Sequence, residues 1–409
     1  MTEKEDKLNI TVKSNNKDLY SFMKLVPTRK KRIEKASNAP ITSDPINQLA
    51  RKLHPERQHM VISEIRDETK TTKTFKLIPD PDSDTKELAY FRAGQYLSLK
   101  VVVDGVLITR PYSISSSPTD ALNGFYEITI RKESHGFLTG HVWEHWKVGT
   151  KVESSGPEGF FYYEPIRDAG TIVAIGGGSG VTPFRSMAKA IINGTLDAKM
   201  VLLYGSSDEH DIIYYNEFKE IEEKYPDKIK VVFVLSCAEV TLKGCEKGLI
   251  STDIIKKYAE KDDNSFFICG PQVMYDFIDK ELEKLDVPLK RIRKEAYGEI
   301  KDILKYPGFP QEVAGKTFKI KVKIGNISKE IPAIATESVL VALERANLAP
   351  PSKCRSGECG FCRSLLISGD VYISSKCDGR RAADNKFNFF HPCSSYPISN
   401  LEIDIPRDA

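Results

Sequence analysis

The sequence predicts a multidomain protein in which an antiparallel β-barrel, a parallel α/β domain and a small α+β domain follow one another along 409 residues. Short strand-like runs between turn residues indicate the barrel, and alternating apolar runs and helical stretches indicate the parallel sheet. Four spaced cysteines mark the third domain. We place the boundaries as follows: an N-terminal extension over 1–55, the barrel over 56–165, the α/β domain over 166–298, a linker over 299–315 and the α+β domain over 316–409.

The composition is that of a globular protein, with 29% charged and 40% hydrophobic residues. A formal net charge of +3 lacks the basic excess of nucleic-acid-binding proteins, so we expect no nucleic-acid partner. We expect no transmembrane segment, because no apolar run approaches the ~20 residues that span a bilayer. The charged start, residues 1–7, shows no secretion signal, so we expect a cytoplasmic protein whose eight cysteines are ligands or free thiols.

Six short runs rich in β-forming residues predict the strands of the barrel. They are Met60–Ile65, Thr72–Ile78, Tyr96–Val103, Tyr112–Ser116, Gly124–Arg131 and Lys151–Ser155.

The next segment alternates between apolar runs and helical stretches, as in a parallel sheet covered by helices. The predicted strands are Thr171–Ile175, Met200–Tyr204, Lys230–Leu235 and Phe266–Cys269, and the predicted helices are Phe184–Ile192, Tyr215–Lys224 and Val273–Leu285. In the last domain we expect a strand over Phe318–Ile324 and a helix over Ser338–Ala346.

Residues 1–55 differ in composition from the rest. They are rich in Lys, Asn, Ser and Asp, and they carry the basic cluster 29–32 without a sustained apolar period. We interpret them as a solvated extension, partly helical or partly disordered, in preference to a partner-binding patch.

Cys354, Cys359, Cys362 and Cys393 have the C-x₄-C-x₂-C…C spacing of a plant-type [2Fe–2S] centre. Glycines inside this loop allow the backbone to wrap closely around a cluster. The pair Cys359 and Cys362 alone would also suit a thioredoxin-like redox pair or half of a zinc site. Cys354, together with the absence of a second closely spaced pair, favours the iron–sulfur centre.

Arg110, Tyr112 and Ser113 form an Arg-x-Tyr-Ser motif on a predicted strand, where alternate side chains point to opposite faces. A guanidinium suits phosphate oxygens and a tyrosine ring suits stacking on a flat heterocycle. The alternative is an ordinary strand with a surface arginine. The motif resembles the flavin signature of the ferredoxin–NADP reductase superfamily, which implies that all three residues bind flavin and that Ser113 faces its N5 edge.

A second group of residues follows on the next strand and helix start. A glycine before a helix lets backbone N–H groups converge on an anion. The group resembles the superfamily's second flavin-phosphate site, with threonine in place of the commoner serine, and it implies FAD, with FMN as the alternative. Its members are Thr129, Arg131, Gly136, Phe137, Leu138 and Thr139.

His141, Glu144 and His145 match an inverted zinc-peptidase motif. We favour a helix behind the flavin phosphates, since two histidines on one helix face are a weak signal.

A strand, a glycine turn and a helix start follow one another over 171–183, where glycines let a pyrophosphate approach the backbone. This resembles the superfamily's nicotinamide site. Tyr204, at the end of the next predicted strand, is included in the predicted nucleotide site. The predicted nucleotide-binding residues of the turn are Gly177, Gly178, Gly180 and Thr182.

Cys269, Gly270 and Pro271 end a later strand and resemble the superfamily's Cys-Gly-Pro. The resemblance implies that Cys269 lies beside the nicotinamide C4 and that it and Ser113 are the catalytic residues. The alternative is a buried strand cysteine. Asp208 and Glu209 would repel a 2′-phosphate and could accept from a free 2′-hydroxyl, so we expect NADH rather than NADPH.

Together these signatures resemble the branch of phthalate dioxygenase reductase and hybrid cluster protein reductase, over residues 58–409. The resemblance implies a β-grasp ferredoxin domain at the C-terminus and an aromatic over the flavin, for which we name Tyr297. It implies an oxidoreductase that passes hydride electrons from NADH through FAD to the cluster and, singly, to a redox partner protein: an oxygenase, a hybrid-cluster enzyme or another terminal enzyme. The alternatives are a redox-sensing regulatory protein and a reductase of a small acceptor such as a quinone or ferric chelate.

Overall fold

The computed structural model describes residues 16–38, 44–134, 136–237, 241–259, 263–295, 298–300, 302–348 and 350–406. The chain divides into two units, Met1–Leu49 and Ala50–Ala409.

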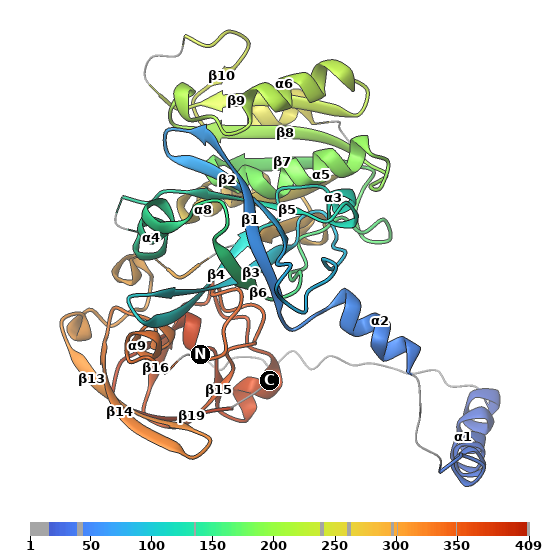
Figure 1. Cartoon of the computed structure of the whole chain (residues 1–409), viewed down its shortest axis with the longest axis vertical. Helices are drawn as coiled ribbons and strands as arrows, with labels where there is room; N and C mark the ends of the chain where they lie inside the picture. Colours follow the sequence, from blue (N-terminus) through green and yellow to red (C-terminus); the bar gives the residue numbers. More distant parts are fainter. Residues whose placement is uncertain are drawn as a thin grey trace, which may run out of the picture. The chain divides into compact units, whose positions relative to one another are not determined.

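The first unit contains α1 (Asn16–Glu34), which has no buried residue, and the beginning of α2 (Pro45–Leu53) (Figure 1). The prediction that the extension is partly helical is confirmed for these two segments.

The barrel has the predicted antiparallel class. Neighbouring strands are antiparallel in the order β4-β3-β6-β1-β2-β5, and a bridge between Ile114 and Ile128 joins the two ends. The strands are β1 (Gln58–Thr69), β2 (Thr72–Pro79), β3 (Tyr96–Val103), β4 (Val106–Ser113), β5 (Tyr126–Arg131) and β6 (Lys151–Ser154). β4 begins at Val106, earlier than predicted, and runs through Pro111. A proline is tolerated in this strand because β4 is the first strand in the order of the sheet.

Inward side chains alternate along the strands and fill the barrel, as Phe75 and Leu77 do on β2. The helix α4 (Phe137–His145) packs onto this core through Leu138 and Val142, and a short helix α3 (Pro118–Leu122) precedes β5.

The second sheet is parallel, in the order β10-β9-β8-β7-β11-β12. Alternate residues of β7 face opposite cores: Ile172 and Ala174 pack with α5 and α6, whereas Val173 and Ile175 pack with α7 and α8. The helices therefore cover both faces, as Figure 1 shows. The elements are β7 (Thr171–Gly177), α5 (Thr182–Ile192), β8 (Lys199–Ser206), α6 (Tyr215–Lys224), β9 (Ile229–Leu235), β10 (Glu246–Lys247), α7 (Thr252–Tyr258), β11 (Asn264–Cys269), α8 (Gln272–Glu283) and β12 (Ile292–Glu295).

The third domain is built on a mixed sheet in the order β14-β13-β19-β15-β17, with β13 and β19 parallel. The helix α9 (Val339–Arg345) packs on it through Val339 and Leu343. The remaining elements are β13 (Thr317–Ile324), β14 (Ile327–Ile334), β15 (Ser364–Ser368), β16 (Val371–Ile373), α10 (Ala382–Lys386), β17 (Phe389–Phe390), β18 (Ser395–Pro397) and β19 (Leu401–Ile405).

The segment predicted as a linker, 299–315, is packed where it is described. Ile303, Phe309 and Val313 are buried against Ala335 and Tyr396 of the third domain. Proline and glycine in this segment make turns, and the apolar side chains between them anchor it.

Among the described helices, none combines the length and apolar character that crossing a membrane requires.

Candidate active site

Residues from four parallel strands lie in one row at the carboxyl edge of the α/β sheet. Gly176 pairs with Tyr204 on one side and with Cys269 on the other, and Cys269 pairs with Glu295. The strand order reverses at β7, and ligands of open α/β sheets bind at such a point, beyond the carboxyl ends of the strands.

The glycine turn after β7 lies tightly against the end of β11. Gly178 has a φ of 54°, which favours glycine. A Cβ on Gly180 would overlap the carbonyl of Cys269, and a Cβ on Gly177 would lie 2.6 Å from Met274 Sδ. The Thr182 hydroxyl donates to the Ser179 carbonyl at 3.0 Å and fixes the start of α5.

Cys269 is buried, and burial, with a further contribution from Glu295, raises the pKa of its thiol. The group is therefore a neutral thiol near pH 7. The Gly270 N–H donates to the Tyr275 hydroxyl at 3.2 Å, and that hydroxyl donates to the Glu295 carbonyl. Tyr275 thus ties the ends of β11 and β12 together.

Glu295 and Tyr275 were not predicted from the sequence. Glu295 ends a four-residue strand with no apolar run to mark it, and Tyr275 lies inside a helix. A Cβ on Gly159 would lie 3.3 Å from Glu295 Oε1 and 2.9 Å from the Tyr96 ring, so Glu295 and Tyr96 both border this glycine.

Tyr204 is fully buried, and its hydroxyl accepts the Ile213 N–H at 3.0 Å. This placement supports a packing role, and its contact with a nucleotide stays a prediction.

The Arg-x-Tyr-Ser motif lies on β4 beside β3. Arg110, Tyr112 and Ser113 pair in register with Leu99, Leu97 and Tyr96. Arg110 and Tyr112 are partly exposed whereas Ser113 is buried, in agreement with the predicted alternation.

Thr129 and Arg131, on β5, both reach the α/β domain. The Thr129 hydroxyl lies 2.8 Å from that of Thr74 and contacts the Tyr214 hydroxyl. Arg131 forms an ion pair with Asp211, and a Cβ on Gly178 would lie 3.0 Å from Arg131 Nη1. Arg131 therefore faces the glycine turn, and its predicted flavin contact stays a prediction.

The helix α4 begins at Phe137, and its N-cap residue Gly136 makes no side-chain capping hydrogen bond. The Thr139 hydroxyl accepts the Glu133 N–H at 3.1 Å. Phe137 is exposed and Leu138 is buried in the barrel core. The first-turn N–H groups of such a helix are suited to an anion.

The two histidines of the zinc-peptidase alternative both lie on α4. The rings of His141 and His145 stack at 4.3 Å. Within the described ranges, no group of three or more His, Cys, Asp or Glu residues is arranged to hold a metal ion.

The four predicted cluster ligands come together in the third domain. Contacts link Cys354 to Cys359 and to Cys393, and Cys362 Sγ lies 3.4 Å from Cys393 Sγ. The Cys359 N–H points to Cys354 Sγ at 3.4 Å. Gly357 and Gly360 have φ values of 86° and 69°.

These cysteines fit a two-iron cluster better than a structural zinc. A [2Fe–2S] centre takes two thiolates on each iron, so three ligands need not converge on one ion. A structural zinc site is more often marked by a second closely spaced pair of ligands, and the sequence around these cysteines has none. N–H groups directed at sulfur are also a feature that tunes iron–sulfur centres.

The ferredoxin domain contacts β4, which carries the flavin motif, and the neighbouring strand β3. The Ser98 hydroxyl on β3 donates to the Lys353 carbonyl at 3.0 Å, and Lys353 Nζ lies 2.5 Å from Glu158 Oε1. On β4, Arg110 Nη1 lies 3.6 Å from Glu344 Oε2 of α9.

Arg355, inside the cluster loop, is 1% exposed. Its guanidinium makes bonds of 2.6 and 3.0 Å to the two carboxylate oxygens of Glu344 and also pairs with Glu299. Tyr297, predicted to cover the flavin, lies outside the described residues.

Three families match the chain in order. Residues 59–163 match the oxidoreductase FAD-binding domain, residues 174–280 match the oxidoreductase NAD-binding domain, and residues 322–397 match the 2Fe-2S iron-sulfur cluster binding domain. The chain therefore belongs to the ferredoxin–NADP reductase superfamily oxidoreductases that carry a C-terminal plant-type [2Fe–2S] ferredoxin domain. It is an NAD(P)H-dependent electron-transfer reductase with domains for FAD, NAD and a [2Fe–2S] cluster.

Curated relatives align with this chain over most of their length. The ferredoxin reductase component of 3-ketosteroid-9-alpha-monooxygenase from Rhodococcus rhodochrous is 24% identical over 348 residues, covering 83% of this chain and 94% of that protein. The reductase of glycine betaine monooxygenase from Chromohalobacter salexigens is 23% identical over 362 residues, covering 82% and 92%. The solved structure of phthalate dioxygenase reductase has a TM-score of 0.61 at 20% identity, covering 86% of this chain and 98% of that one, and shows the same fold.

Proposed function

We propose that this reductase oxidises NADH and delivers single electrons from its cluster to the terminal component of an oxygenase. The names of the relatives support the choice of partner, since the proteins from Rhodococcus rhodochrous and Chromohalobacter salexigens are both reductase components of monooxygenases. The observation that carries the proposal is the contact of the ferredoxin domain with two strands of the barrel: the Ser98 hydroxyl on β3 bonds to Lys353 beside the cluster loop, and Arg110 on β4 pairs with Glu344 of α9.

FAD, when bound, would accept a hydride, and a [2Fe–2S] cluster would carry electrons one at a time. The residues of this chain bind and orient these groups. The glycine turn, with Arg131 beside it, would hold the nucleotide pyrophosphate through backbone N–H groups and one guanidinium. Cys269 would pack its neutral thiol beside the nicotinamide, and its neighbours Glu295 and Gly270 are fixed by Tyr275.

Arg110 and Tyr112 would bind the flavin from β4, and Ser113 would place its hydroxyl near the reacting edge. The open first turn of α4 would accept the flavin phosphates, with Thr139 shaping the turn. Burial of Ser113 and Cys269 keeps this part of the site away from bulk water.

The four cysteines would hold the cluster, and one of them suggests where electrons leave. Cys354, Cys362 and Cys393 are buried whereas Cys359 is exposed. A partner that approaches Cys359 would come nearest to the cluster, so we place the docking surface around this residue.

We also propose that the enzyme works in the cytoplasm. All eight cysteines lie in the described part of the chain and none is joined in a disulfide there, which agrees with a reducing compartment.

Anaerobic titration with NADH tests the function. We expect the absorbance of flavin and then of the cluster to bleach, and reoxidation when an oxygenase component is added. If the flavin bleaches while the cluster stays oxidised, the proposed electron path is wrong. The Cys393→Ala variant is the matched control, because it should retain flavin reduction and lose transfer to the partner.

A further inference from the structure

The first helix of the chain, α1, has an apolar face that lies open. Its members recur at spacings of three, four and seven, which places them on one side of a helix. They are Leu19, Phe22, Met23, Val26 and Ile33, and they are 58%, 68%, 65%, 71% and 65% exposed. We call these five residues the apolar face of α1.

The sequence did not reveal this period, because Tyr20, Leu25 and Pro27 fall off the face and interrupt the pattern. The expectation of a segment without an apolar period is therefore wrong for α1. Isolated exposed apolar residues need no explanation, but a continuous face on a helix with no buried residue does.

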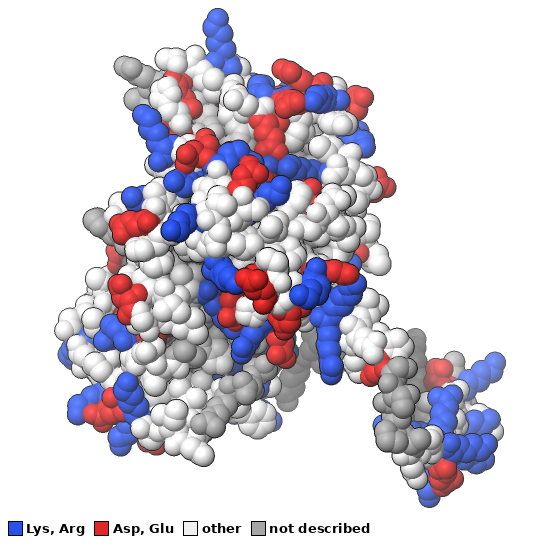
Figure 2. Space-filling view, in the orientation of Figure 1, with Lys and Arg blue, Asp and Glu red and all other residues white. Residues whose placement is uncertain are grey.

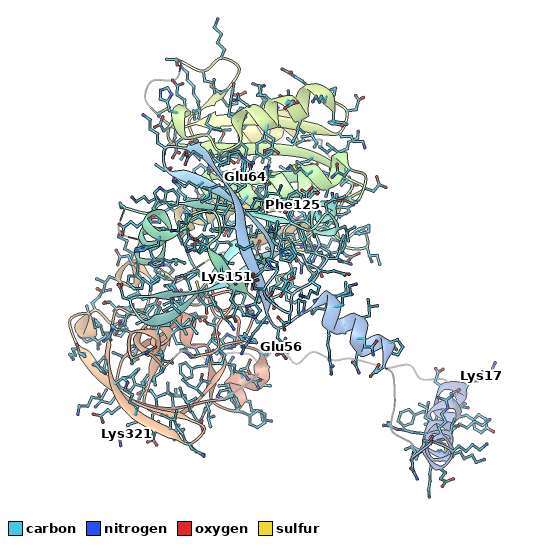
Figure 3. The ribbon with its side chains drawn as sticks, viewed as in Figure 1. Lys17, Glu56, Glu64, Phe125, Lys151 and Lys321 are labelled. Atoms are coloured by element: carbon cyan, nitrogen blue, oxygen red, sulfur yellow. The ribbon has the colours of Figure 1, made fainter. Side chains whose placement is uncertain are left out.

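The rest of the helix surface is strongly basic. Lys17, Lys24, Lys31 and Arg32 lie away from the apolar face, whereas Lys30 falls within it, between the directions of Leu19 and Met23. Figure 2 shows lysine and arginine gathered over α1, and in Figure 3 side chains stand out from the helix from Lys17 onward. Over 16–35 the cations are Lys17, Lys24, Arg29, Lys30, Lys31, Arg32 and Lys35, and the anions are Asp18 and Glu34.

The short helix α2 repeats this design. Ile46 and Leu49, one helical turn apart, are 79% and 57% exposed, and Arg51 and Lys52 lie in its last turn. Two successive helices thus combine exposed apolar side chains with cations.

We propose that α1 binds along an anionic lipid surface, with its apolar face in the boundary between headgroups and acyl chains and its cations on the headgroups. Basic residues on the polar face with large apolar residues opposite are the features of helices that lie in a membrane interface. Each cation near an anionic bilayer adds to the attraction. The helix would lie on the membrane, since no described helix meets the requirements for crossing one.

A lipid surface fits α1 better than a groove in a protein. Pro27 interrupts the hydrogen bonding of the helix, and Lys30 falls within the apolar face. A protein groove needs a matching shape, whereas a fluid bilayer adapts to an irregular face and lets the long side chain of a lysine within that face extend to the headgroups. The proposal uses no residue of the redox site, so it and the proposed function can fail separately.

Vesicle flotation of the full-length, cofactor-loaded protein tests the proposal. The probes are vesicles of phosphatidylcholine alone and vesicles that also contain phosphatidylglycerol. We expect binding to the anionic vesicles that exceeds binding to neutral vesicles by about tenfold or more and weakens as salt rises. Equal binding to both kinds of vesicle, or binding to neither, would overturn the proposal.

Paired substitutions locate the binding face. Phe22→Ser combined with Val26→Ser should reduce vesicle binding about tenfold or more, because two apolar side chains leave the interface. Leu25→Ser is the matched control: this leucine is 61% exposed on the same helix but lies off the apolar face, so binding should change little. Lys30→Gln with Lys31→Gln and Arg32→Gln should remove most of the preference for anionic vesicles.

Reduction of ferricyanide by NADH should be unchanged in every variant, since all substitutions lie in the N-terminal unit. Equal losses in the Leu25→Ser control and the double variant would contradict a defined face. Light scattering tests whether the apolar face of α1 instead binds a second copy of the chain. Self-association that depends on Phe22 and Val26, without vesicle binding, would show this and overturn the lipid proposal.

Discussion

The Glu344 carboxylate joins the predicted flavin motif to the cluster loop. Its Oε1 lies 2.6 Å from Arg355 Nη1, and its Oε2 lies 3.6 Å from Arg110 Nη1. Glu344 and Arg355 are both almost fully buried. One carboxylate thus holds the ferredoxin domain against the strand β4.

Glu344→Gln should destabilise the protein by about 3 kcal/mol, because it leaves Arg355 buried with one charged partner, Glu299, in place of two. Denaturant unfolding of the loaded enzyme measures this change. Reduction of the cluster after flavin reduction should also be slower. Glu330→Gln, which removes an exposed ion pair with Lys319, is the control and should cost less than about 1 kcal/mol. Equal costs for the two variants would contradict the role given to Glu344.

Arg131→Ala should raise the KM for NADH by about tenfold, because one charged hydrogen bond to the nucleotide is lost. Bound flavin should stay unchanged. Asp211→Asn should have a smaller effect in the same direction, since Asp211 would act on the nucleotide through the guanidinium that it pairs with. Steady-state kinetics and the flavin content of the purified variants distinguish a nucleotide-binding role of Arg131 from a flavin-binding role. A fall in flavin content with an unchanged KM for NADH would contradict the nucleotide contact and support the flavin contact of Arg131 predicted from the sequence.

Asp208 should set the preference for NADH. Glu209 is engaged by the Thr241 and Leu242 N–H groups, whereas Asp208 is exposed. We expect kcat/KM to favour NADH over NADPH by about tenfold or more, and Asp208→Ser to narrow the difference. A tenfold preference of the unaltered enzyme for NADPH would refute this assignment.

Glu127 should make stability depend on pH at the boundary between the barrel and the α/β domain. Its Oε2 lies 2.6 Å from Arg185 Nη1. Burial alone would raise the pKa of Glu127, but attraction to Arg185, Lys189 and Arg66 outweighs burial and lowers that pKa below its ordinary value of 4.5.

A carboxyl whose pKa is lowered by folding adds stability above its unfolded value, and this stability is lost as the pH falls through its folded value. The loss should therefore begin as the pH falls below about 4.5. Glu127→Gln should be less stable at pH 7 and should lack this part of the acid slope. Identical acid slopes in thermal unfolding of the two proteins would contradict the assignment.

The sequence predicted the parts of the fold that have strong local signals. Tyr215–Lys224 is helical as predicted, and the cysteine spacing located a loop whose four thiols do come together. The surroundings of Arg131 could not be predicted from local sequence signals. Its partner, Asp211, is brought close only when the two domains fold against each other. Glu295 and the apolar face of α1 were not predicted. A short strand and an interrupted apolar period give a sequence pattern too weak to distinguish from an irregular segment.

Electrons should pass from flavin to cluster within one chain, because the ferredoxin domain contacts β3 beside the cluster loop and contacts β4 through α9. Anaerobic rapid mixing with NADH at several protein concentrations tests this central claim most directly. We predict that cluster bleaching follows flavin bleaching at a rate that does not change with protein concentration. A rate that rises in proportion to protein concentration would contradict it.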